Sequence, residues 1–190
     1  MNQIQELTLK VQRELYAKLL PGEVLLNIRE NWLEKLLETH HCNVEALMLG
    51  FMFADFKLQE ATDLRKPNDH IRMSLDYARQ AFDRYSEISL DDQNIVLEII
   101  ETHHGGNHNH IESKLFKNAD SLAFLEPKGW FHFFSLNYDN KGDQSFGFAM
   151  RKLDEIIEDR YLHVDLNDEV VAEAKLLKEK YEWMKLRMLK

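Results

Sequence analysis

The histidines of this chain are clustered in the sequence, because seven of the nine lie between residues 40 and 110. Helical spacing puts two of them where a helix should be apolar. His41 precedes Val44 and Met48 by three and seven residues, and His103 ends a second apolar stripe that includes Val96 and Ile99. Imidazoles on inward faces can meet, and neutral imidazole is a common ligand of transition metals. The ordered set of histidines therefore predicts a metal site, whereas His108 and His110 fall in a Gly- and Asn-rich segment that predicts a solvated loop.

The elements that position these residues are predicted to be helices. Only 7 Gly and 3 Pro interrupt the chain, too few for the many tight turns of a sheet protein. Ser89 reads as a helix cap, and Gly105-Gly106 as a helix end. The aromatic stretch 130–138 fits either a strand or a short helix, and its sequence does not distinguish the two. The expected helices are 4–20, 24–40, 44–53, 56–64, 70–85, 89–104, 111–125, 145–161 and 167–188.

Composition narrows the class of protein. A length of 190 residues suits a single compact all-α domain, and a net charge of −9 disfavours a nucleic acid duplex as partner. The single Cys42 suits a reducing compartment, no apolar run is long enough for a membrane span, and the first residues lack the apolar core of a signal peptide. We therefore expect a cytoplasmic protein without a membrane partner, and a homo-oligomer is possible.

Three sequence stretches resemble a known family. They are HHCNVEALMLG, VLEIIETHHGG and ESKLFKNADSLAFLE, with EATDLRKPNDHIRMSLDYARQAF between the first two. Together they resemble the HD superfamily of metal-dependent phosphohydrolases over residues 38–126. The resemblance implies an HD-like helical core there and extra C-terminal helices over 127–190. It also implies a divalent metal ion, such as Mn, Fe, Co, Ni or Zn. The metal ligands that it implies are His41, Asp63, His70, His103, His104 and Asp120.

One departure from the family pattern matters, because the chain contains no His-Asp dipeptide. Asp63 is the preferred match for the aspartate of that dipeptide, and Thr62 precedes it. Asp55 follows His41 by only 14 residues, which is a short spacing, and Asp69 leaves no loop before the next helix. Any of the three placements leaves the dipeptide histidine missing.

The missing histidine leaves three interpretations open. In the first, water takes its place in a weaker, still hydrolytic site. In the second, the metal shifts toward His70, His103 and His104, which the resemblance implies as the other half of a two-metal site. In the third, the site has kept only binding. For a metal held between His41, Asp63, Asp120 and one of the distal histidines, Asp120→Ala is predicted to abolish metal retention without unfolding the chain.

The resemblance implies hydrolysis of a phosphate ester, for example a nucleotide, so the expected partner is a small phosphorylated molecule. Asp63 and His104 are the implied catalytic residues, with His104 as general acid for the leaving group. Cations must neutralise phosphoryl oxygens. Arg65 and Lys66 directly follow Asp63, and Lys128 follows Asp120, so these three cations are the expected substrate-binding residues.

Three alternatives remain beside the hydrolase. The chain could be a catalytically degenerate HD domain that binds a nucleotide or small phosphate as a sensor or interaction module. It could be an oxygen-using di-iron enzyme with a similar His/Asp set. It could also be a structural protein whose amphipathic C-terminal helix contacts a partner, although that helix is expected to pack on its own domain.

Overall fold

The computed structural model describes residues 1–18, 23–129, 147–158 and 168–188. Over these ranges every regular element is a helix and no strand occurs, so the all-α prediction is confirmed. The chain divides into two compact units. The first unit comprises Met1–Glu23 and Thr39–Phe116, and the second comprises Val24–Glu38 and Lys117–Lys190. The organisation as one domain stays a prediction.

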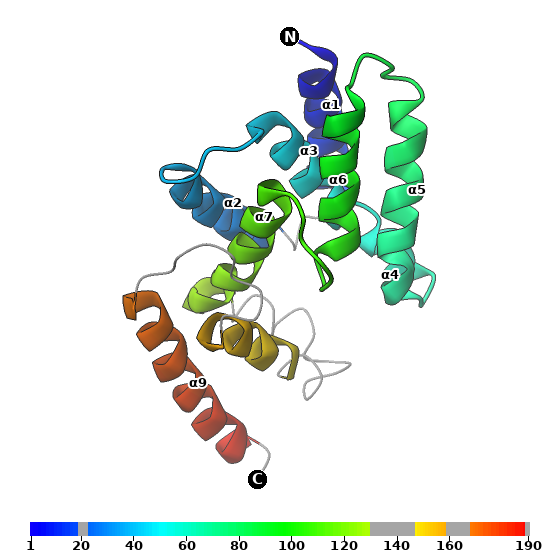
Figure 1. The fold of residues 1–190 in the computed structure, drawn as a ribbon. Coiled ribbons are helices and arrows are strands. Elements are labelled where there is room, and N and C mark those ends of the chain that lie inside the picture. Colours follow the sequence, from blue (N-terminus) through cyan, green and yellow to red (C-terminus); the bar gives the residue numbers. More distant parts are fainter. Residues whose placement is uncertain (19–22, 130–146, 159–167, 189–190) are drawn as a thin grey trace. The chain divides into compact units, whose positions relative to one another are not determined.

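The first unit is built around one central helix. Its elements are α1 (Gln3–Lys18), α3 (Val44–Ala54), α4 (Leu58–Asp63), the 3-10 turn η1 (Pro67–Asp69), α5 (His70–Phe82), α6 (Leu90–Thr102) and the start of α7 (Ile111–Leu122). Helix α3 is buried over most of its length and contacts α1, α5 and α6 (Figure 1). Its apolar sequence therefore explains its central place.

Local chemistry sets the ends of these helices and their close approach. The Asn43 side chain accepts a hydrogen bond from the Ala46 N–H and begins α3, and Ser89 caps α6, as predicted. Between the two helices, a Cβ atom at Gly50 would lie only 2.5 Å from the Ile99 Cδ1 atom. A glycine at this position is therefore what allows α3 and α6 to pack so closely.

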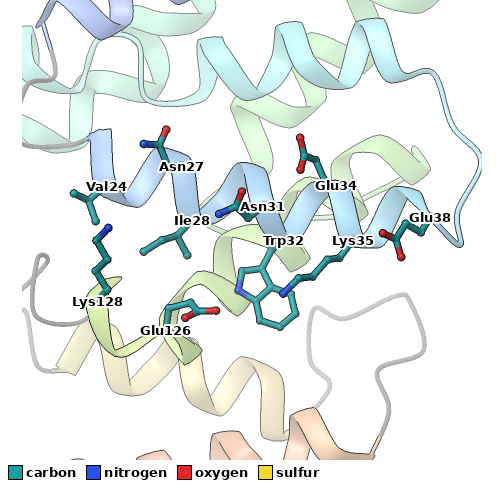
Figure 2. Close-up of a pocket in the computed structure, with 10 residues that line it drawn as sticks. All are labelled: Val24, Asn27, Ile28, Asn31, Trp32, Glu34, Lys35, Glu38, Glu126 and Lys128. Carbon is teal, nitrogen blue, oxygen red and sulfur yellow. The ribbon is translucent and has the colours of Figure 1, made fainter.

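The second unit contains α2 (Glu23–Leu37, from Val24 on), the end of α7, the 3-10 turn η2 (Ala123–Leu125), a helix over 147–157 and α9 (Asp168–Met188). The ring centroids of Phe124 and Phe148 lie 5.8 Å apart in an edge-on contact. Helix α9 contacts η2 and buries Ala174 and Tyr181. One face of α2 lines a cavity of about 460 Å³ (Figure 2).

Most predicted helices have counterparts within a few residues. The predicted segment 130–138 lies outside the described residues. None of the helices that the structure describes is both long and apolar enough to span a membrane. The cytoplasmic location stays a prediction.

Candidate metal centre

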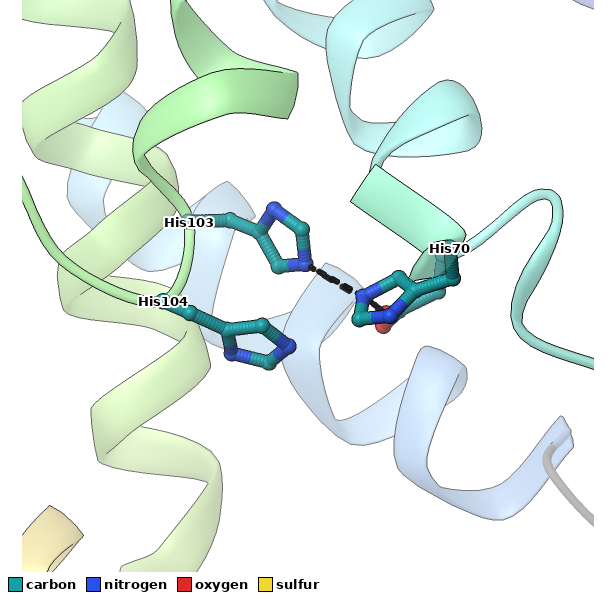
Figure 3. A group of neighbouring side chains, drawn as sticks. His70, His103 and His104 are labelled. Atoms are coloured by element: carbon teal, nitrogen blue, oxygen red, sulfur yellow. Dashed lines mark hydrogen bonds and ion pairs between the residues drawn. The ribbon is translucent and has the colours of Figure 1, made fainter. Parts of the chain in front are cut away.

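Four potential metal ligands meet in the first unit, at the ends of three helices. Asp55 follows the last residue of α3, His70 begins α5, and His103 and His104 follow α6. One ligand atom of each residue lies within 4.8 Å of the corresponding atoms of the other three. Figure 3 shows the three imidazoles turned toward a common point. We call these four residues the His/Asp cluster.

The backbone fixes how two of the rings present their nitrogens. The Nδ1 atom of His70 lies 2.5 Å from the carbonyl oxygen of Pro67, and the Nδ1 atom of His103 lies 2.6 Å from that of Ile100. A carbonyl oxygen can only accept, so each Nδ1 atom carries the hydrogen and each neutral ring has its lone pair on Nε2. This is the arrangement typical of metal-binding histidines.

The two lone pairs face each other. The Nε2 atoms of His70 and His103 are 3.1 Å apart, and each lies 3.6 Å from Oδ1 of Asp55. Ligand bonds of about 2.1 Å place neighbouring ligand atoms about 3.0–3.4 Å apart around one transition metal ion. The three atoms are therefore close to the separation that a shared divalent cation requires.

The surroundings favour a cation over a shared proton. Burial lowers the pKa of His70, although the nearby Asp55 opposes this effect, so the ring prefers its neutral form. Helices α3 and α6 both direct their C-terminal ends toward the cluster, and the dipole of a helix makes that end negative. His104 is exposed whereas His70 and His103 are buried, so the cluster opens to solvent on the side of His104.

The cluster contains Asp55 and not Asp63. Asp63 is exposed at the end of α4, where its carboxylate accepts a hydrogen bond of 2.8 Å from the Gln59 side chain. Asp69 pairs with the exposed Arg72 across 3.4 Å. The sequence signal that could have identified Asp55 is its place directly after the apolar segment that forms α3.

Asp55 was disfavoured because it follows His41 by only 14 residues, and His41 itself was expected on the inward stripe of Val44 and Met48. In the structure α3 begins at Val44 behind the cap residue Asn43, so His41 precedes the helix and is exposed. Val44 is exposed as well. No helical phase therefore directs His41 inward. By contrast, His103 is buried, as its apolar stripe predicts.

Asp120 belongs to the second unit, where cations surround it. Its carboxylate lies 2.7 Å from Nη2 of Arg29 and 2.5 Å from Nζ of Lys152. Burial alone would raise the pKa of Asp120, but Arg29, Lys152 and Lys117 hold it well below its usual range. Lys117 in turn lies 3.1 Å from Glu155. The carboxylate of Asp120 thus has partners other than a metal.

The three predicted substrate-binding cations are all exposed. Arg65 and Lys66 occupy the turn between α4 and η1, in the first unit. The φ angle of Arg65 is 60°, a left-handed conformation that glycine adopts at less cost. Lys128 belongs to the second unit and lines the cavity beside α2.

The segment after His104 is an ordered loop held by Glu98. The Glu98 carboxylate accepts hydrogen bonds from the backbone N–H groups of Asn109 and His110 and from Ser113 Oγ. His108 is buried, with its Nδ1 atom 3.2 Å from the Thr102 hydroxyl. The prediction of a solvated loop is therefore wrong for His108.

Comparison with known proteins does not assign the chain to a family. No family model, no curated protein and no solved structure matches it. The resemblance to the HD superfamily therefore depends on the residues of this chain. What the structure establishes is that the described part of the chain is all-helical and holds a His/Asp group able to bind a metal ion.

Proposed function

We propose that this chain is a metal-dependent hydrolase of phosphate esters, and that Asp55, His70 and His103 bind its divalent metal ion. The observation that carries the proposal is the 3.1 Å separation of the two Nε2 atoms, both of which present lone pairs. Lone pairs at that distance repel each other unless a cation lies between them. A bound divalent metal ion supplies Lewis-acid activation of water and of a phosphoryl oxygen.

The HD-type assignment depends on the resemblance together with the new place of the aspartate. If Asp55 is the aspartate of the family's dipeptide, Ala54 occupies the position of the missing histidine. The His70, His103 and His104 side chains then correspond to the other half of the two-metal site that the resemblance implies. This corresponds to the second of the three interpretations drawn from the sequence.

The remaining roles follow from exposure and charge. His104 lies on the solvent side of the cluster, so it is placed to give a proton to the departing alkoxide. Arg65 and Lys66 are exposed in the turn that leads to His70, and their charges would neutralise phosphoryl oxygens. In this proposal the first unit provides metal ligands, a proton donor and cations, and Asp63 has no role in the reaction.

The test begins with the metal content of the untagged protein after exposure to Mn, Fe, Co, Ni or Zn. It continues with turnover of p-nitrophenyl phosphate and of nucleoside monophosphates. We expect near-stoichiometric metal and turnover in the wild type, loss of both in His103→Ala, and retention of both in the exposed control His41→Ala. His104→Gln should keep the metal and lose most turnover. Absence of metal after reconstitution, or full turnover in His103→Ala, would refute the proposal.

A second candidate function is a binding module for a nucleotide or small phosphate. Two observations favour it: Ala54 in place of the dipeptide histidine, and the ion pairs that occupy Asp120. A module of this kind would bind metal and a nucleoside monophosphate but release no phosphate. The same panel therefore separates the two functions, because only the hydrolase turns substrate over.

A further inference from the structure

The loop that follows α6 returns to a side chain of the same helix. The Glu98 carboxylate accepts hydrogen bonds from the backbone N–H groups of Asn109 and His110, at 2.7 and 2.9 Å. The same carboxylate lies 2.6 Å from the Ser113 hydroxyl and 2.8 Å from Nδ1 of His110. Glu98 thus joins the two ends of the segment 98–110, and this segment contains two members of the His/Asp cluster.

Inside this segment, further contacts hold the residues on both sides of the two cluster histidines. The Thr102 hydroxyl donates a hydrogen bond of 2.7 Å to the Glu98 carbonyl oxygen, and the Thr102 carbonyl oxygen accepts one of 2.8 Å from the Gly105 N–H. Gly105 and Gly106 have φ angles of 140° and 143°, which side-chain-bearing residues rarely adopt. A Cβ atom at Gly106 would lie 3.3 Å from Cγ2 of Thr102. The chain therefore turns back closely over the end of α6.

The two cluster histidines in this segment depend on the backbone to different degrees. His103 is buried, and its Nδ1 atom lies 2.6 Å from the Ile100 carbonyl oxygen. His104 is exposed, and its ring centroid lies 4.0 Å from that of His103. Figure 3 shows both rings directed toward His70. Because core packing does not position an exposed ring, the backbone of the closed segment determines where the His104 imidazole lies.

We infer that Glu98 is a positioning residue of the metal centre, because it closes the segment 98–110 and so holds His103 and His104 where a metal ion can bind. This inference rests on the metal binding of the proposed function and is independent of hydrolysis. Without the closure, the segment would gain conformational freedom, and metal binding would have to order the two histidines again. Ligands that must first be ordered bind a metal ion more weakly than ligands that are held in place.

The test compares the Co²⁺ affinity of two matched variants of the untagged full chain, followed by the visible absorption of bound cobalt. Glu98→Gln keeps the size of the side chain but replaces one acceptor oxygen by an NH₂ donor. We expect affinity on the order of tenfold lower and an altered absorption band. Glu112→Gln is the control, because Glu112 is also a buried carboxylate that accepts a backbone N–H, from Asn43 at 2.7 Å. Asn43 lies at the N-terminal end of α3 and Asp55 at its C-terminal end, so this control should bind Co²⁺ as the wild type does.

A second pair of variants tests the same closure through the backbone. Gly106→Ala strains the turn and should also weaken Co²⁺ binding, whereas Gly147→Ala has open space around the new methyl group and should not. Circular dichroism verifies that each variant is folded. Wild-type affinity and absorption in Glu98→Gln, or an equal loss in Glu98→Gln and Glu112→Gln, would overturn the inference.

The outcomes separate this inference from the proposed function. The expected Co²⁺ pattern without turnover of p-nitrophenyl phosphate would overturn the hydrolase and support the positioning role of Glu98. Turnover and Co²⁺ binding that are both unchanged in Glu98→Gln would support the hydrolase and overturn the positioning role. A wild-type chain that binds no Co²⁺ would overturn both.

Discussion

The imidazoles of His70 and His103 face each other through Nε2 atoms that are 3.1 Å apart, while their Nδ1 atoms face backbone carbonyl oxygens. Neither ring can donate to the other in this tautomer. The carboxylate of Asp55 lies 3.6 Å from both Nε2 atoms. Three ligand atoms are therefore held in place by the ends of helices α3, α5 and α6 before any cation binds.

Metal binding should stabilise the folded chain through these three residues. At a free metal concentration one hundred times the dissociation constant, the gain in the free energy of unfolding is about 2.7 kcal/mol. We expect a metal-dependent rise in melting temperature for the wild type and for His41→Ala. Asp55→Asn and His103→Ala should show little or none. Differential scanning fluorimetry with and without chelator measures the difference, and an equal rise in Asp55→Asn would exclude Asp55 as a ligand.

Asp120 should contribute mainly to stability. Its replacement by Asn leaves the buried cations of Arg29 and Lys152 without their shared carboxylate, which should cost about 3–5 kcal/mol of unfolding free energy. This expectation differs from the sequence prediction that Asp120→Ala removes metal without unfolding. The control is Asp154→Asn, whose half-exposed pair with Lys178 should cost less than about 1 kcal/mol. Urea denaturation measures the free energy of unfolding of both variants. An equal loss in the two variants would contradict the structural role assigned to Asp120.

Lys117 should make the protein more stable at alkaline pH. Burial and the neighbouring Lys152 lower its pKa from 10.5 to about 8. Below pH 8 the folded chain carries an unfavourable buried charge, and this penalty disappears as the pH rises from 8 to 10.5, because the unfolded chain then binds more protons. Lys117→Met removes this titration, so the stability of the variant should rise less than that of the wild type between pH 8 and 10.5. Urea midpoints across this range test the slope; a difference that does not vary with pH would refute it.

Glu98 should make the chain sensitive to acid. Burial alone would raise the pKa of this carboxyl, but hydrogen bonds from Ser113, His110 and Asn109 lower it to about 2. The stabilisation is present above the ordinary pKa of 4.5 and is lost as the pH falls from 4.5 to 2. Glu98→Gln should cost about 2 kcal/mol near neutral pH and less in acid. Glu101→Gln, exposed on the same helix, should cost almost nothing at either pH.

Arg65 should lower the stability of the folded chain and, in the proposed hydrolase, strengthen substrate binding. Its φ angle of 60° is strained for a side-chain-bearing residue, so Arg65→Gly should raise the free energy of unfolding by about 1 kcal/mol. If the proposed hydrolysis is correct, the same variant should raise KM for a phosphate ester because a cation is lost. Arg79→Gly, in the ordinary helical backbone of α5, should instead lower stability by about 1 kcal/mol. Thermal denaturation and steady-state kinetics distinguish the two effects.

Much of the fold was predictable because its signals are local. The apolar stripe of α6, its Ser89 cap and the glycines after His104 all lie within one stretch of chain, and they indicate where that helix begins and ends. The inward direction of His103 follows from the same stripe. The resemblance named His70, His103 and His104 together, and the structure places these three side chains close to one another at helix ends.

The sequence by itself therefore determined the helices, their order and the histidines available to a metal. The tertiary structure decided which carboxylate joins them. Asp55, Asp63 and Asp69 all lie near helix ends, but only the packing of α3 against α5 and α6 brings one of them to the histidines. The tertiary structure also pairs Asp120 with Arg29 and Lys152, which are distant from it in the sequence. Helix ends depend on neighbouring residues, whereas ligand sets and buried ion pairs depend on contacts between segments far apart in the chain.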